Sequence, residues 1–146
     1  MIHMFALLRI IIGSIFLVSS FGKLFSPYQN FLYAVQAYEL LPSQGEILVA
    51  QILPWIEVIV GAFVVLGLWT SLSLKGAAVL FGVFVTVVGQ ALLRGLPLEN
   101  CGCFGGLIHF KPQMVIVMDS ACLIITLVLL RNLLKTRKFG LDYLFQ

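Results

Sequence analysis

The fold is decided by the segment LSLKGAAVLFGVFVTVVGQALL, which occupies residues 72–93. A helix needs about 20 mainly apolar residues to cross the hydrocarbon core of a bilayer, and this segment supplies them. A buried strand is the alternative for an apolar run, but strands rarely exceed about 10 residues. We therefore interpret residues 72–93 as a membrane-spanning helix, because in lipid a helix satisfies its own backbone hydrogen bonds.

Three further apolar segments have the same character, and they occupy residues 4–22, 47–69 and 114–130. The first contains Arg9, and Ser19-Ser20-Phe21 is a poor cleavage site, so we expect it to remain as a span and not to be removed as a signal peptide. The sequence thus predicts an all-α fold. It is an integral membrane four-helix bundle, formed as a single membrane domain over residues 1–146.

The composition supports this class of protein. Of the 146 residues, 61% are hydrophobic and 10% are charged, whereas a soluble domain carries about 25% charged residues. High hydrophobicity excludes a disordered chain, and three cysteines are too few for a disulfide-stapled module. The net charge is +3, but the basic residues form no stripe through the body of the chain. We therefore expect the protein to contact the lipid bilayer and not to bind nucleic acid.

The distribution of basic residues predicts the topology, because Lys and Arg gather in cytoplasmic loops. The expected tail, residues 131–146, and the short second loop hold more of them than the other side, where basic residues are set among glutamates. We expect both termini to be cytoplasmic and the first and third loops to face outward. The basic residues on the cytoplasmic side are Lys75, Arg131, Lys135, Arg137 and Lys138.

The first outer loop is expected to contain a short helix over residues 28–41, bracketed by Pro27 and Pro42. Its apolar residues recur at helical spacing, which is typical of a helix lying in the membrane interface with its apolar side down. A connector that packs on the bundle fits the pattern equally well. The apolar residues are Phe31, Leu32, Val35 and Tyr38.

The third outer loop carries the densest chemistry of the chain, with Cys101 and Cys103 separated by one glycine. A disulfide between them would close almost no chain and would be strained, so it suits exchange better than stability. His109 could lower a thiol pKa or carry a proton. A redox-active pair is the favoured interpretation; a structural turn and a metal site are the alternatives. We expect no metal, because C-x-C-x5-H matches no usual zinc spacing.

Ionisable residues inside the spans are functional candidates, since a charge in lipid is costly. Glu57 lies in the second span and Asp119 near the start of the fourth. Arg9 could pair with Glu57 or extend back to the cytoplasm, and Lys23, at the outer end of the first span, could reach Asp119. We expect charged residues so placed either to hold neighbouring helices together by polar contacts or to form a proton path to the thiols.

Two glutamines, Gln51 and Gln90, lie in the outer halves of their spans. With Lys23 and Asp119 they are expected to form a polar patch beneath the cysteine loop. Small residues are expected where helices touch, because close backbone approach drives packing in lipid. The candidates are Gly13, Gly61, Gly67, Gly76, Ala78, Gly82 and Gly89.

Taken together, these residues resemble the MauE/DoxX group of small membrane proteins. The most specific element is Asn100-Cys101-Gly102-Cys103-Phe104-Gly105, which is similar to the MauE-type signature. Asp119 lies where the group tends to carry an acidic residue. The looser matches in the first two spans are Arg9, Gly13, Phe16, Gly22, Lys23, Pro27, Pro42, Glu57, Gly61 and Gly67.

The resemblance implies a four-helix bundle in the prokaryotic plasma (inner) membrane, with the cysteine loop outside the cytoplasm. It also implies thiol–disulfide chemistry beside a thioredoxin-fold partner, in the maturation of a disulfide-rich protein. The DoxX side of the group hints at a quinone as cofactor. Comparable membrane oxidoreductases use C-x-x-C with a second pair, whereas this chain has C-x-C and no second pair.

The function expected from the sequence is therefore a membrane thiol–disulfide relay, and whether it turns over as an enzyme is left open. Cys101 and Cys103 would exchange, and Asp119 with Lys23 or His109 would handle protons. A non-catalytic assembly scaffold and a small-molecule or metal-ion carrier are the alternatives. The candidates for contacting a cofactor are Arg9, Gln51, Glu57 and Gln90.

Overall fold

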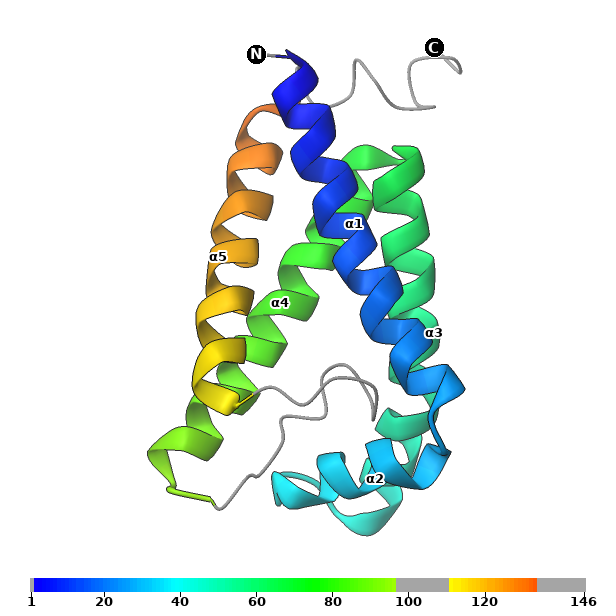
Figure 1. Cartoon of the computed structure of the whole chain (residues 1–146), viewed down its shortest axis with the longest axis vertical. Coiled ribbons are helices and arrows are strands. Elements are labelled where there is room, and N and C mark those ends of the chain that lie inside the picture. Colours follow the sequence, from blue (N-terminus) through cyan, green and yellow to red (C-terminus); the bar gives the residue numbers. More distant parts are fainter. Residues whose placement is uncertain (1, 97–110, 134–146) are drawn as a thin grey trace.

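The computed structural model describes residues 2–96 and 111–133, and all regular structure in these ranges is helical. These ranges form four long helices and one short helix, and Figure 1 shows that the short helix lies across one end of the bundle. The element bounds are α1 Ile2–Phe25, α2 Tyr28–Ala37, α3 Ser43–Leu66, α4 Thr70–Leu93 and α5 Pro112–Arg131.

Four of these helices are long and apolar enough to cross a membrane. The candidate spans are His3–Phe25, Ser43–Leu66, Thr70–Leu93 and Pro112–Arg131. A helix satisfies most of its backbone hydrogen bonds internally, which suits these segments to lipid. The predicted all-α four-helix membrane bundle is confirmed.

The long helices pack as two antiparallel pairs, α1 against α3 and α4 against α5. A tight turn joins α3 to α4, with Gly67 at φ 66° and Trp69 at φ 43°. From this turn α3 and α4 diverge, so that they lie far apart at the opposite end of the molecule (Figure 1). We name that opposite end, which α2 crosses, the α2 end of the bundle.

The α1–α3 contact is the closest in the bundle because both helices present glycine where they cross. A Cβ atom added to Gly13 would lie 2.9 Å from the carbonyl oxygen of Gly61 and 2.9 Å from the backbone nitrogen of Val65. Only hydrogen fits in this space. The core continues beyond the crossing, where the rings of Phe16 and Phe81 have centroids 4.5 Å apart.

The short helix α2 packs onto the bundle and ends at Ala37, four residues before the predicted end. Phe31 and Tyr38 are buried beneath it. Its end is held to the end of α4, because Arg94 Nη1 donates to the carbonyl oxygen of Tyr38 (3.5 Å) and Arg94 Nη2 lies 3.5 Å from Glu39 Oε2. The short helix predicted for this segment is present and packs on the bundle, and its position in the membrane interface stays a prediction.

Candidate functional site

A fully buried ion pair joins α1 to α3. Lys23 Nζ lies 2.5 Å from Glu57 Oε1, and neither side chain is exposed. Ser19 completes the group, because its Oγ accepts a hydrogen bond from Lys23 Nζ (3.1 Å) and donates one to Glu57 Oε2 (3.4 Å). Both carboxylate oxygens therefore have a partner, which a charge enclosed away from water requires.

The register of α1 against α3 explains this pairing. Lys23 lies ten residues beyond the Gly13 crossing point, about 15 Å along α1, and Glu57 lies four residues from Gly61, about 6 Å along α3 toward the same end. Side chains point back toward the N-terminus of their own helix. In antiparallel helices these directions are opposite, so the long Lys23 side chain and the Glu57 carboxylate converge across the remaining gap of roughly 9 Å.

Asp119 adds a third ionisable group from a third helix, α5. It is buried, and its charge acts on both Lys23 and Glu57. Its Oδ2 atom has no hydrogen-bond partner within residues 2–96 and 111–133. Lys23 was expected to reach Asp119, but among the described residues its Nζ donates hydrogen bonds to Glu57 and Ser19. Asp119 is thus an electrostatic neighbour of the pair.

Arg9 lies in the other half of the bundle. It is buried, and it sits on the opposite side of the Gly13 crossing from Lys23. Because its side chain also points toward the N-terminus of α1, it extends away from Glu57. The structure therefore gives Glu57 a different partner from the Arg9 that the sequence suggested, and Arg9 is enclosed by the bundle.

The two glutamines do not join the buried group. Gln51 is exposed and lines a cavity of about 410 Å³ that reaches Lys23 between α1, α2 and α3. Gln90 is half-buried in α4 and makes none of the hydrogen bonds that connect Lys23, Ser19 and Glu57. The expected polar patch is therefore replaced by a more compact set of Lys23, Ser19, Glu57 and Asp119.

The cysteine pair and its histidine, Cys101, Cys103 and His109, lie outside the described residues. The helix ends that bracket this segment, Leu93 of α4 and Pro112 of α5, lie at the α2 end of the bundle (Figure 1). The buried ionisable group approaches the same end, since Lys23 is two residues from the end of α1. The remaining cysteine, Cys122, is buried in α5 with its thiol free.

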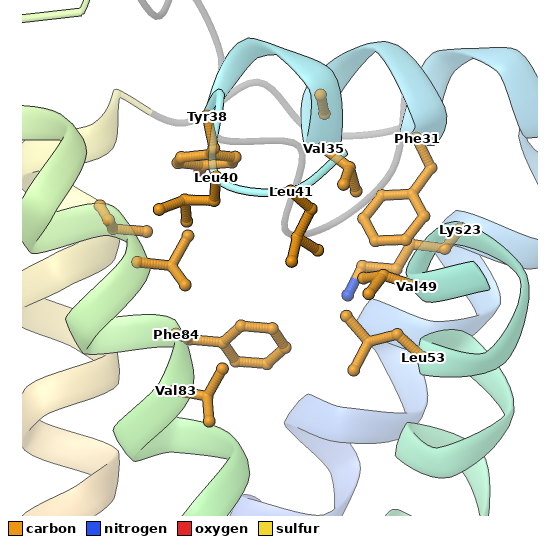
Figure 2. A pocket seen from close by; sticks show the side chains of 13 residues that line it. Lys23, Phe31, Val35, Tyr38, Leu40, Leu41, Val49, Leu53, Val83 and Phe84 are labelled. Atoms are coloured by element: carbon orange, nitrogen blue, oxygen red, sulfur yellow. The ribbon is translucent and has the colours of Figure 1, made fainter. Parts of the chain in front are cut away.

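An apolar cavity of about 120 Å³ lies directly beside the ion pair, beneath α2 and between α3 and α4. Figure 2 shows Lys23 in the wall of this cavity among aliphatic and aromatic side chains, which cover its ammonium group. Lys23 Nζ lies 5.0 Å from the ring centroid of Phe31 and 5.2 Å from that of Phe84, so both rings stabilise the charge by cation–π contact.

Tyr38, at the α2 end of this cavity, has a pKa raised to about 12, because burial and the nearby charge of Asp119 disfavour its anion. The sequence interpretation missed Ser19, Phe31 and Phe84 as parts of this site. Ser19 could have been found, because it lies one helical turn before Lys23 on the same face. No local signal identifies the two rings, which come from different helices.

These features define a class of protein: a polytopic membrane protein whose spans enclose a Lys–Glu pair and a neighbouring aspartate beside an apolar cavity. The family model described as "Methylamine utilisation protein MauE" matches residues 1–132, and the chain belongs to this family. Searches of curated proteins and of solved structures found no match. The match confirms the MauE part of the resemblance; the likeness to DoxX and the significance of the cysteine motif stay predictions.

Proposed function

We propose that this protein is a membrane thiol–disulfide relay that serves the maturation of a disulfide-containing protein. The observation that carries the proposal is the family match over residues 1–132, which supports a membrane protein of redox-related maturation in methylamine utilisation. The sequence adds the chemistry, since Cys101 and Cys103 are the only closely spaced thiols in the chain.

The proposed exchange is balanced in electrons and protons. In the oxidising direction, a thiolate of a thioredoxin-fold partner attacks one sulfur of the Cys101–Cys103 bond, which breaks as a mixed disulfide forms. The partner's second thiolate then attacks the mixed disulfide and releases the second sulfur. The partner becomes a disulfide, Cys101 and Cys103 become thiols, and two electrons and two protons pass to this protein. The reducing direction is the reverse.

Protons must therefore enter or leave with every exchange, and Asp119 is the proposed carrier, together with Lys23 or His109. The Oδ2 atom of Asp119, which has no hydrogen-bond partner among residues 2–96 and 111–133, supports this role, because such an oxygen can take up a proton without breaking a hydrogen bond within this part of the chain. The ion pair of Lys23 with Glu57 places one positive and one negative charge near it. A quinone is the electron acceptor that we would test first.

The proposed orientation places both termini in the cytoplasm and the cysteine segment outside it, in the prokaryotic plasma membrane. A membrane-impermeant maleimide applied to intact cells tests this directly in a Cys122→Ser background. Labelling of Cys101 and Cys103 after mild reduction supports the orientation. Labelling only after the membrane is opened contradicts it and removes the basis for an extracytoplasmic relay.

Single substitutions of the loop cysteines test the relay itself. Cys101→Ser or Cys103→Ser removes the second thiol that would attack and release a mixed disulfide on the remaining cysteine. A mixed disulfide with a partner should therefore accumulate, and it should disappear on reduction. Cys122→Ser is the matched control, because that thiol is buried in α5 and should form no such adduct. If the double Ser variant still matures the client protein, the assembly-scaffold alternative replaces the relay.

A further inference from the structure

We propose that the cavity between the end of α1, the start of α2 and α3 binds one glycerolipid of the bilayer through its ester carbonyl groups. This is the cavity of about 410 Å³ that Gln51 lines, and we name it the Gln51 cavity. Its volume falls within the range of about 300–1,000 Å³ that is typical of small-molecule sites. The proposal is independent of the thiol exchange proposed above.

The first observation is a pair of polar side chains on the lipid-facing surface of α3. Gln51 and Trp55 both line the cavity, and they lie one helical turn apart on the same face of the helix. Both are exposed, Trp55 by 59%. The hydrocarbon around a membrane span contains no acceptor for an amide or indole N–H, so a ligand that supplies an oxygen acceptor is stabilised there.

The second observation is the depth of the cavity. Gln51 lies about 12 Å and Trp55 about 18 Å along α3 from Ser43, where α3 begins at the α2 end of the bundle. Side chains point toward the N-terminus of their own helix, so both extend back toward that end. The other rim is formed by Ser26 and Tyr28, which lie beyond the end of the α1 span. The cavity therefore covers the boundary between interface and hydrocarbon, where a glycerolipid carries its ester carbonyls.

The third observation is the lack of an accessible charge. Among the described residues that line the cavity, Lys23 alone carries a formal charge near neutral pH, and its side chain is fully covered and paired with Glu57. The polar groups that remain are an amide, an indole, a phenol and a hydroxyl. Such groups recognise neutral oxygen atoms and do not discriminate between headgroup charges. We therefore expect phosphatidylglycerol and phosphatidylethanolamine to bind equally well.

The cavity is also open to the bilayer. Leu24 of α1 and Trp55 of α3 line it, and both are exposed on the surface of their membrane spans. Most of the other lining residues are apolar, among them Phe31 and Pro54. A lipid can thus enter from the side without passing through the bundle, and its acyl chains remain against apolar surface while the ester groups meet the N–H donors.

Photolabelling of the full chain in nanodiscs tests the site. The matrix is a diether phosphatidylcholine, which has no ester carbonyl, and the probe is a small fraction of diester phosphatidylcholine with a diazirine near the glycerol end of one acyl chain. Mass spectrometry should place the adducts on the peptides that carry residues 24–31 and 50–55.

A double variant tests the role of the two donors. Gln51→Leu/Trp55→Phe removes both N–H groups at exposed positions and nearly preserves side-chain size, so the fold should be retained and labelling should fall about tenfold. Trp69→Phe is the matched control, because it makes the same change at the chain's other tryptophan, beyond the opposite end of α3, and should leave labelling unchanged. Adducts spread evenly over the lipid-facing spans, at the same level in the double variant, would overturn the proposal.

Competition identifies the chemistry that is recognised. Unlabelled diester phosphatidylglycerol and diester phosphatidylethanolamine, each replacing part of the matrix, should reduce labelling equally, whereas diether phosphatidylglycerol should not reduce it. Equal protection by diester and diether phosphatidylglycerol would refute recognition of the ester groups, and protection that follows headgroup charge would refute the neutral site. A short-chain benzoquinone that protects more strongly than the diester lipids would assign the cavity to a different class of ligand and overturn the proposal.

Discussion

The buried pair of Lys23 and Glu57 allows a quantitative prediction about stability. Removing one partner of a buried ion pair leaves an uncompensated charge and costs about 3–5 kcal/mol, whereas replacing both partners with neutral side chains of similar size costs little. We therefore expect Lys23→Met and Glu57→Gln each to lower the free energy of unfolding by about 3–5 kcal/mol. The double variant should lose about 1 kcal/mol or less, because neither charge is left behind.

The magnitude follows from the geometry. The two atoms are 2.5 Å apart with no exposure of either side chain, so solvent does not screen the interaction. Asp119 reduces the expected loss of stability in Glu57→Gln, because its negative charge acts on Lys23 and can partly replace that of Glu57. Glu57→Gln should therefore be the milder of the two single substitutions.

The assay is reversible unfolding in mixed micelles of a mild detergent and sodium dodecyl sulfate, followed by helical circular dichroism. The four proteins of the double-mutant cycle yield the coupling energy, which on these figures is about 5 kcal/mol or more. The chain supplies its own control in Arg94 and Glu39, a pair 3.5 Å apart with side chains 43% and 67% exposed. That pair should couple by less than about 1 kcal/mol. Equal coupling energies for the two pairs would refute the reasoning.

Two further predictions concern the helix crossing and the α2 end of the bundle. Gly13→Ala should destabilise the protein by about 1–3 kcal/mol, because the new methyl group would overlap the backbone of α3. Gly82→Ala, whose new methyl group would have no atom of residues 2–96 and 111–133 within 4 Å, should not destabilise it in the same unfolding assay. The pKa of Tyr38 is raised to about 12 in the folded protein from an ordinary value of 10, so between these pH values only the unfolded state ionises. The free energy of unfolding should therefore be unaffected below pH 10 and should fall by up to about 3 kcal/mol between pH 10 and 12. Tyr38→Phe should abolish that loss of stability, whereas Tyr33→Phe, which changes an exposed ring, should retain it. An unchanged loss between pH 10 and 12 in Tyr38→Phe would contradict the assignment of this loss to Tyr38.

Much of the architecture could be predicted from local sequence. Each span is recognisable from its own composition, because the cost of exposing polar backbone to lipid acts residue by residue and does not depend on the neighbouring helices. The close contact of α1 with α3 was also foreseeable in kind, since Gly13 and Gly61 stood among the small residues expected at helix contacts. Gly82, from the same set, has no close neighbour among the described residues, so the pattern alone does not say which small residues touch.

The amino-acid sequence by itself thus determined the number of spans, the positions of the buried ionisable residues and the family. Only the tertiary structure decided that Glu57 pairs with Lys23 and not with Arg9, because the partners are 34 residues apart and their meeting depends on the register of two antiparallel helices. The same holds for the cavity, whose walls come from α2, α3 and α4. Hydropathy is a property of one segment, whereas an ion pair or a cavity exists only where the packing of several segments brings atoms within a few ångströms of one another.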